Sequence, residues 1–257
     1  MKRRLLQIPT INDQDRTLMR LEQVHRLRED FMRARIKVTN QVKASKRRIS
    51  KNPVDEDLSP DVHYESLLST KVFDAPEKAY EKQMKELAKG LPAYDWFCEQ
   101  AGCSTTSFAT ILAETGDLSK YSNPAKVWKR MGLSVNGEGE SDKNRTKGVN
   151  TGYSQRRRMI AYRAGSAIVK NGKEYRQVYL DRKAYENERD EAGYNEAYVK
   201  RNRSFMSGTY ASKENQERVK SGRLPLCVID LRAQRYMTKR LLRDLWIRWN
   251  EEVKEAA

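Results

Sequence analysis

The sequence offers one obvious chemistry, the binding of anions by a dense group of cations. Three consecutive arginines stand at positions 156–158, and the polar segment 134–152 before them is rich in lysine and arginine. Three adjacent residues of a helix cannot all face a core, so we expect the arginine triplet to be exposed. Exposed cations at this density neutralise phosphate oxygens. The residues predicted to contact a phosphate backbone are Lys143, Arg145, Lys147, Arg156, Arg157, Arg158 and Arg163.

A second candidate for phosphate binding is a turn before a short helix. Gly102 permits a tight turn, and Ser104 or Thr105 can cap the helix that follows it. Backbone N–H groups at a helix N-terminus favour a bound anion. We therefore add Gly102, Ser104 and Thr105 to the predicted interface. A plain helix–helix turn is the alternative interpretation.

Charge is concentrated in the same part of the chain. The 257 residues hold 51 Lys+Arg against 35 Asp+Glu, a formal charge of +16. Residues 120–170 hold 12 of these cations and 3 acids, hence a net charge of +9 in a fifth of the length. Such a concentration indicates a binding surface for a polyanion. Nucleic acid is the leading partner, ahead of an acidic membrane or an acidic protein.

Other chemistries find little support. Cys98, Cys103 and Cys227 form no CxxC pair, which argues against a zinc site or a disulfide framework, and only His25 and His63 could serve histidine chemistry. We see no phosphate-loop, dinucleotide or metal-ligand motif, and we expect no cofactor or metal. The basic start is not a signal peptide, and no apolar run could cross a membrane. We expect a cytoplasmic protein of a prokaryote or a phage-infected cell, with no membrane partner.

Helical patterns account for the whole sequence, so the predicted class is all-α. Asn12 or Asp13 can cap a long helix that runs to about residue 49, with the narrow apolar seam of a coiled coil. We expect this helix to form a homo-oligomer or to pack on another helix. The seam residues are Val24, Leu27, Phe31, Ala34 and Val38.

Composition divides the chain into four segments. They are the coiled-coil-like helix 1–51, a proline-containing acidic linker 52–74, a helix-hairpin-helix-like domain 75–191, and an irregular segment with a final helix, 192–257. At the end of the linker, Asp74 is predicted to cap a helix with Pro76 in its first turn. Glu114 is interpreted as a capping or solvated residue. The last helix carries an apolar stripe: Leu231, Leu241, Leu242, Leu245, Trp246, Trp249 and Val253.

The order of several short motifs resembles a known family. The chain is similar to the C-terminal domain of the Piv-type, DEDD insertion-sequence transposases, serine-using elements of which some are guided by a bridge RNA. The long first helix resembles the coiled coil that precedes this domain, and Arg235–Trp249 resembles its C-terminal end. The matching motifs are Ala101-Gly-Cys-Ser104, Thr110-Ile-Leu-Ala-Glu-Thr-Gly-Asp117, Met131-Gly-Leu133, Gly148-Val-Asn-Thr-Gly152 and Gln155-Arg-Arg-Arg158.

Two departures from the family bear on activity. The family's RuvC-like N-terminal domain carries four acidic metal ligands, and the sequence leaves no room for it before the long helix. The resemblance implies a catalytic serine after the Gly-Leu motif, but the usual Ser-Ser-Gly pattern is missing. Ser141 is the nearest candidate by position and Ser134 the second, with an ordinary loop serine as the alternative.

Three functions remain open from the sequence. The first is a transposase-derived protein that binds DNA, with or without a structured RNA, through residues 102–163. The second is an active serine-dependent recombinase that needs a separate RuvC-like partner, which would also supply an acidic Mg²⁺ site. The third is a structural or assembly protein that coats nucleic acid.

Overall fold

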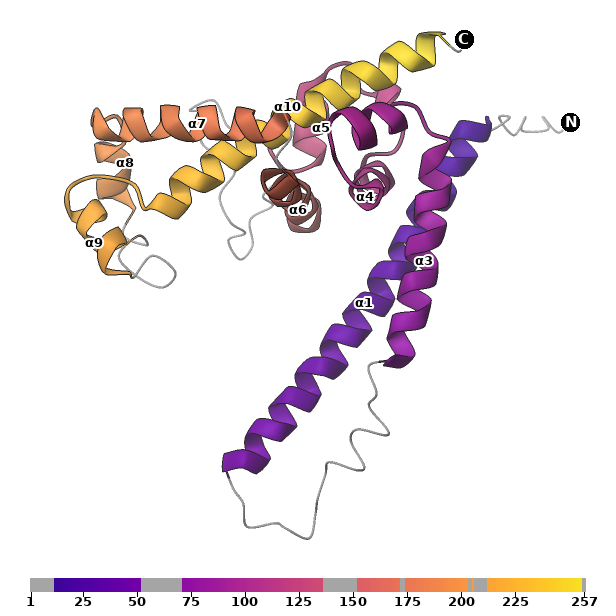
Figure 1. The fold of residues 1–257 in the computed structure, drawn as a ribbon, viewed down its shortest axis with the longest axis horizontal. Helices are drawn as coiled ribbons and strands as arrows, with labels where there is room; N and C mark the ends of the chain where they lie inside the picture. Colours follow the sequence, from indigo (N-terminus) through magenta and orange to yellow (C-terminus); the bar gives the residue numbers. More distant parts are fainter. Residues whose placement is uncertain are drawn as a thin grey trace, which may run out of the picture. The chain divides into compact units, whose positions relative to one another are not determined.

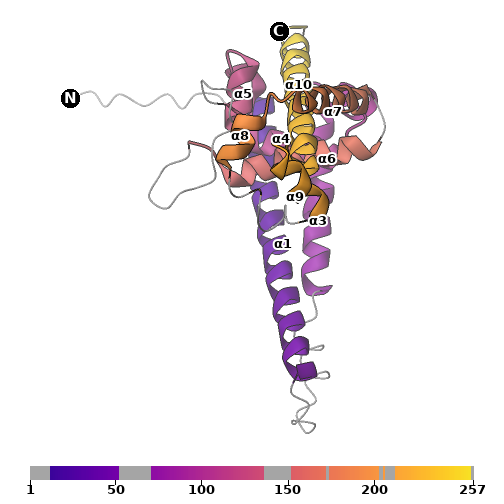
Figure 2. The same cartoon turned by 90° about the vertical axis from the view of Figure 1, so that its left-hand side faces the viewer.

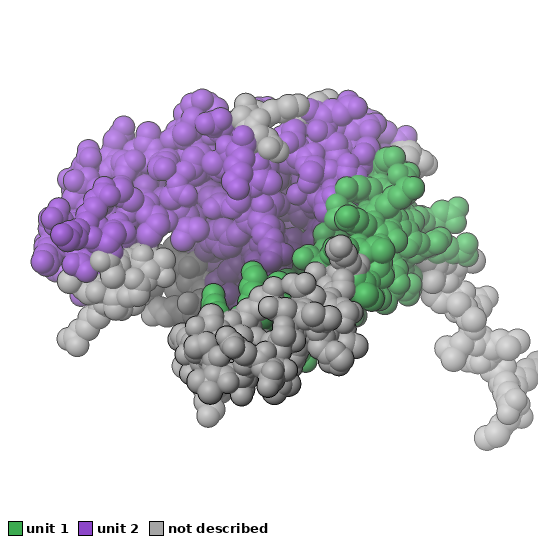
Figure 3. Space-filling view, turned by 60° about the horizontal axis from the view of Figure 1, so that its bottom comes forward, with its two compact units in different colours: residues 1–91, 112–117 green, residues 92–111, 118–257 purple. Residues whose placement is uncertain are grey.

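The structure, a computed structural model, describes residues 12–51, 71–135, 152–171, 174–202, 205 and 212–255. Every regular element in these ranges is a helix, which confirms the predicted all-α class (Figure 1). The chain forms two compact units, coloured separately in Figure 3. The first comprises residues 1–91 and 112–117, and the second comprises residues 92–111 and 118–257.

The first unit is a pair of antiparallel helices, α1 (Asp13–Lys51) and α3 (Lys71–Lys89), which lie side by side in Figures 1 and 2. Asn12 caps α1 as predicted, its side-chain oxygen accepting from the Asp15 N–H at 2.6 Å. The Phe31 ring of the predicted seam lies 5.7 Å from the Tyr80 ring of α3. The seam therefore has a partner helix in its own chain, and the homo-oligomer stays a prediction.

Two details of this helix pair differ from the expectations. Leu27 is 44% exposed, so it does not belong to a buried seam. Helix α3 begins at Lys71 rather than at Asp74, which places Pro76 inside the helix. Pro76 lacks the N–H that would bond to the carbonyl four residues before it, so the first turn of α3 is joined to the rest of the helix by one backbone hydrogen bond fewer. Ion pairs between the helices, such as Arg28 with Glu81 at 2.9 Å, fix their register.

A buried polar group lies in the same unit. His25 is fully buried, and its Nε2 lies 3.2 Å from Glu114 and 3.8 Å from Glu29. The interpretation of Glu114 as solvated is wrong, because only 6% of the residue is exposed. Two carboxylates buried together need a proton or a cation between them. His25 and Arg33, which lies 3.2 Å from Glu29, are placed to provide one.

The second unit is organised around its last helix, α10 (Leu226–Glu255). Leu241, Leu242, Leu245 and Trp249 of the predicted stripe are buried, but Leu231 is 45% exposed because it lies about 200° around the helix from the buried Ile229. Three other helices pack along α10 (Figure 1). They are α5 (Pro124–Arg130), α6 (Gln155–Asn171) and α7 (Glu174–Glu191).

Helices α6 and α10 touch closely at a glycine. A Cβ added to Gly165 would lie 2.3 Å from the Thr238 hydroxyl, a distance that no real Cβ tolerates. Beside this contact the Gln234 amide donates to the Tyr162 carbonyl at 2.8 Å and to the Ser166 hydroxyl at 2.6 Å. The close approach fixes which face of α6 is turned toward α10.

The remaining elements of the second unit are short. A π-helical turn, Trp96–Gln100, places Phe97 against Phe108 with ring centroids 5.2 Å apart. Phe108 belongs to α4 (Thr105–Thr115), whose last residues are grouped with the first unit. Three further short helices are η2 (Leu118–Lys120), α8 (Glu196–Arg201) and α9 (Lys213–Lys220). A small core near α8 contains Val199, Phe205, Leu224 and Ile229.

Candidate nucleic-acid interface

Two arginines from different helices bind one turn of the backbone. This turn, residues Met131–Val135, follows α5 and is called the Gly132 turn below. The Arg158 Nε of α6 donates to the Gly132 carbonyl at 2.7 Å. The Arg235 side chain of α10 donates to the carbonyls of Leu133 and Ser134, at 2.9 and 2.5 Å. The end of α5, the start of α6 and the middle of α10 therefore meet at this turn.

The turn needs a glycine for two reasons. Gly132 has a φ of +68°, which other residues rarely adopt. A Cβ at this position would also meet the Arg158 Cβ at 3.1 Å and the Tyr153 ring at 3.3 Å. The close approach shows that residues on either side of the segment 136–151 lie in contact.

Arg158 corrects one of the predictions. Only 8% of the residue is exposed, and its guanidinium lies 3.4 Å above the Tyr153 ring. A guanidinium can be buried when carbonyls and an aromatic face replace its water. Because consecutive helical residues advance by about 100°, three adjacent arginines cover most of a turn and one of them faces inward. Arg158 therefore holds the fold together and is not part of an exposed surface.

The other predicted cations are exposed, half-buried or outside the described residues. Arg163 is exposed and lies about 200° from Gly165 around α6, so it points away from α10. Arg156 and Arg157 are half-buried near the start of the same helix. Outside the described residues lie Ser141, Lys143, Arg145 and Lys147.

The predicted turn at Gly102 is present, but its side chains serve the fold. Gly102 has a φ of +68°, as a tight turn requires. Ser104 caps α4, its hydroxyl accepting from the Ser107 N–H at 3.1 Å. The Thr105 hydroxyl lies 3.2 Å from the Tyr94 hydroxyl, within hydrogen-bond distance. The hydroxyls of Ser104 and Thr105 are thus already engaged within the protein.

The Gly102 turn and the arginine triplet do not form one cluster. The pKa of Tyr175 is raised, mainly by burial and by its hydrogen bond to Asp244, with a smaller contribution from Cys103. Cys103 therefore lies near Tyr175, which follows the end of α6. The triplet lies at the start of α6, whose 17 residues span about 26 Å. Tyr175 and the triplet thus stand at opposite ends of this helix.

Sequence reasoning missed a group of cations on α10. The Lys239 ammonium lies 4.2 Å above the Trp128 ring of α5, and the Trp128 ring N–H donates to the Lys239 carbonyl at 2.9 Å. Burial lowers the pKa of Lys239, and the nearby Arg235 charge lowers it further. No carboxylate among the described residues forms an ion pair with Lys239 or Arg240. An anion would relieve the repulsion between these cations.

One exposed lysine of α5, Lys129, directly follows Trp128. We call this group the α5–α10 basic face. A helical projection of α10 could have found part of it, because Lys239 and Arg240 lie away from the buried stripe. The residues of the basic face are Lys129, Arg235, Lys239 and Arg240.

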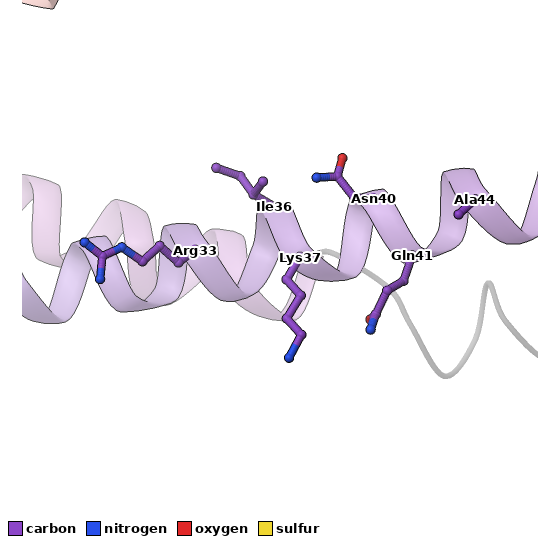
Figure 4. Close-up of a pocket in the computed structure, with 6 residues that line it drawn as sticks. All are labelled: Arg33, Ile36, Lys37, Asn40, Gln41 and Ala44. Carbon is purple, nitrogen blue, oxygen red and sulfur yellow. The ribbon is translucent and has the colours of Figure 1, made fainter. Parts of the chain in front are cut away.

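Of the two predicted nucleophilic serines, only Ser134 lies within the described residues. Ser134 is half-buried in the Gly132 turn, where its carbonyl accepts from Arg235. Its role as a nucleophile, like that of Ser141, stays a prediction. A hollow on α1 is lined by six residues of that helix alone, so it is the side of a helix rather than an enclosed cavity (Figure 4). Its lining residues are Arg33, Ile36, Lys37, Asn40, Gln41 and Ala44.

The described residues contain neither a metal-binding group nor a membrane-spanning helix. No three His, Cys, Asp or Glu residues in the described ranges are grouped so that they could hold a metal ion. Within the same ranges, no helix combines the length and the apolar composition that a membrane crossing requires.

The fold and the charge distribution define a basic, all-helical protein in two units. Its sequence matches no known family model, and neither the curated proteins nor the solved structures contain a significant match.

Proposed function

We propose that this chain binds DNA through the phosphate backbone, in the context of transposition or recombination, and that the α5–α10 basic face makes the main contact. The observation that carries the proposal is the environment of Lys239. Its ammonium is partly buried beside a second cation, Arg235, with its pKa lowered, and no described carboxylate balances the pair. A site that concentrates positive charge in this way is stabilised by a bound anion.

The surroundings of this pair favour an extended anion over a single ion. Lys129 extends the positive charge onto α5, and Arg240 extends it along α10. Phosphates of a DNA strand recur at regular short intervals, so several cations on adjacent helices can each neutralise one. Hydrogen bonds from Arg158 and Arg235 to the Gly132 turn hold the supporting helices in place. The contact we propose is therefore with backbone and carries no sequence preference of its own.

The transposition context rests on the family resemblance. The Met131-Gly-Leu133 motif coincides with the Gly132 turn, and the Arg235–Trp249 segment coincides with the helix that carries Lys239 and Arg240. The motifs that carry the resemblance thus surround the basic face. An active recombinase would still need a RuvC-like partner for its acidic metal centre. A structured RNA is the alternative ligand for the same face.

The test is the salt dependence of duplex DNA binding, measured by fluorescence anisotropy. We expect the logarithm of the affinity of the unaltered protein to fall linearly with the logarithm of salt concentration, because cations are released from DNA on binding. The double variant K129A/R240A should bind several-fold more weakly and lower the salt slope by about 1 to 2. Both side chains are exposed, so the variant should fold normally.

The matched control is K78A/K82A, which removes two exposed lysines from α3 and the same total charge. It should bind DNA like the unaltered protein. Equal losses in the two double variants would show that overall charge, not the basic face, determines binding. A flat salt response of the unaltered protein would contradict the proposal altogether.

A further inference from the structure

Three tyrosines and two arginines alternate along α10, α7 and the turn that follows α7. The Arg182 guanidinium lies 4.7 Å from the Tyr236 ring of α10 and 4.6 Å from the Tyr185 ring. The Arg189 guanidinium lies 5.6 Å from the Tyr185 ring and 5.4 Å from the Tyr194 ring. These five residues, in the order Tyr236, Arg182, Tyr185, Arg189 and Tyr194, form a continuous series that we call the tyrosine–arginine ladder.

The rings of the ladder are too exposed to be explained by core packing. Tyr236 is 43% exposed, Tyr185 46% and Tyr194 72%. Large aromatic rings left in water retain an unsatisfied apolar surface. The hydrophobic cores of the unit are built from other residues, such as Trp249 and Phe97, which are fully buried.

A buried carboxylate holds the middle of the ladder in place. Arg182 forms an ion pair with Glu186 at 2.5 Å, and Glu186 is only 2% exposed. Arg232 of α10 approaches the same carboxylate at 3.3 Å and the Tyr198 ring at 5.4 Å. A buried carboxylate thus fixes the Arg182 guanidinium between its two rings. A surface fixed in this way loses little entropy when a flat ligand stacks on it.

The charges on the two sides of the ladder differ. Asp181 and Glu188 lie on the side of Tyr185 away from Arg182 and Arg189, because helical residues advance by about 100°. On the other side, Tyr236 has Lys239 and Arg240 as its neighbours at i+3 and i+4. A polyanion that approaches the ladder should therefore run along α10 and extend its uncharged groups toward α7.

We propose that the tyrosine–arginine ladder binds unpaired nucleobases, so that the ligand is a nucleic acid with a single-stranded stretch whose phosphates contact α10. Bases stack on aromatic side chains and on arginine guanidinium groups, and a strand that follows a basic groove beside aromatic rings is the usual arrangement for single-strand binding. The bases of a duplex are already stacked on one another and cannot use the ladder. This inference rests on the proposed function and names the form of its ligand.

The experiment compares four probes of about 12 nucleotides, a length within the range that single-strand sites cover. They are oligothymidylate, oligouridylate, an abasic oligodeoxynucleotide and a DNA duplex, each measured by fluorescence anisotropy with the full-length protein. The variant Y185A/Y194A should lower the affinity for both base-containing single strands by about tenfold or more. It should leave the affinities for the duplex and the abasic strand unchanged. Y185F/Y194F should bind like the unaltered protein, because phenylalanine still stacks.

The control on the same helix is L180A. Leu180 is 42% exposed and lies about 140° from Tyr185 around α7, so its loss should affect no probe. Unchanged single-strand binding by Y185A/Y194A, or an equal loss for all four probes, would overturn the ladder while leaving the basic face intact. If the unaltered protein binds none of the probes in a salt-dependent manner, the ladder and the proposed function are both wrong. The thymidylate and uridylate probes distinguish a DNA ligand from an RNA ligand.

Discussion

The cations on the two flanks of α10 have opposite surroundings. On the α7 flank, Arg218 of α9 and Arg223, which precedes α10, lie 2.9 and 3.5 Å from Asp190 of α7, whose side chain is completely buried. On the α5 flank, Lys239 has an aromatic ring and another cation as its neighbours, and no described carboxylate pairs with it. Arginine and lysine are common on both flanks, so residue type alone does not separate the two groups.

The comparison shows what determines whether a cation stabilises the fold or remains available to a ligand. An acid buried within the unit pairs with nearby guanidinium groups before any ligand does, because an unpaired buried charge is costly. Where no acid is buried nearby, the cations remain available to solvent or to a ligand. Net charge over a segment is therefore a weaker guide than the positions of its buried carboxylates.

The largest expected effect comes from breaking the paired flank. Asp190→Ala should lower the free energy of unfolding by about 3 to 5 kcal/mol, since two arginines lose their carboxylate. It also removes the acceptor of the Leu224 N–H, which lies 2.9 Å from the Asp190 side chain. Urea unfolding followed by circular dichroism measures the change. Asp181→Ala, at an exposed position of the same helix, should stay within about 0.5 kcal/mol of the unaltered protein.

An intermediate effect should separate two arginines of α6. Arg158→Met removes the hydrogen bond to the Gly132 carbonyl and the contact with the Tyr153 ring, which should cost about 1 to 3 kcal/mol in unfolding free energy. Arg163→Met changes an exposed residue of the same helix and should leave stability within about 0.5 kcal/mol. Thermal or urea unfolding of both variants provides the measurement. Equal destabilisation would refute the assignment of Arg158 as structural and Arg163 as a surface residue.

The smallest effect should appear in the pH dependence of binding on the α5 flank. The pKa of Lys239 lies below the ordinary 10.5 because of burial and Arg235. Lys239 should therefore lose its proton at a lower pH than an ordinary lysine does. DNA then loses an ionic partner. We expect the affinity for duplex DNA to fall by a few-fold as the pH rises toward the pKa of an ordinary lysine. This is about the effect of losing one phosphate contact. The Lys239→Arg variant should bind with the same affinity across this range, and an unchanged pH profile would contradict the assignment.

The helical class and many helix ends were predictable because they depend on local chemistry. Asn123 caps α5 with its side chain accepting from the Lys126 N–H at 3.2 Å, and Pro124 occupies the first position, both of which are local signals of a helix start. The buried stripe of α10 followed from its spacing. The start of α3 was misplaced, since a proline near a helix start is compatible with more than one first residue.

The candidate site was less predictable because it depends on contacts between distant segments. Nothing local to Arg156–Arg158 indicates that a carbonyl at Gly132 and a ring at Tyr153 would bind one of the three. Likewise, Lys239 becomes part of a basic face only because Trp128, 111 residues earlier, packs against it. Burial of Glu114 beside His25 also requires the helix pair of the first unit.

The contact between Gly132 and Tyr153 has a consequence for insertion of new sequence. A segment whose two ends already meet can change its length with little loss of stability, since each doubling of a flexible loop costs only about 0.6 kcal/mol. A change of length between residues 136 and 151 should therefore leave the contact of Gly132 with Tyr153 and Arg158 in place. Natural variants that differ in length at this point should keep the same junction between α5 and α6.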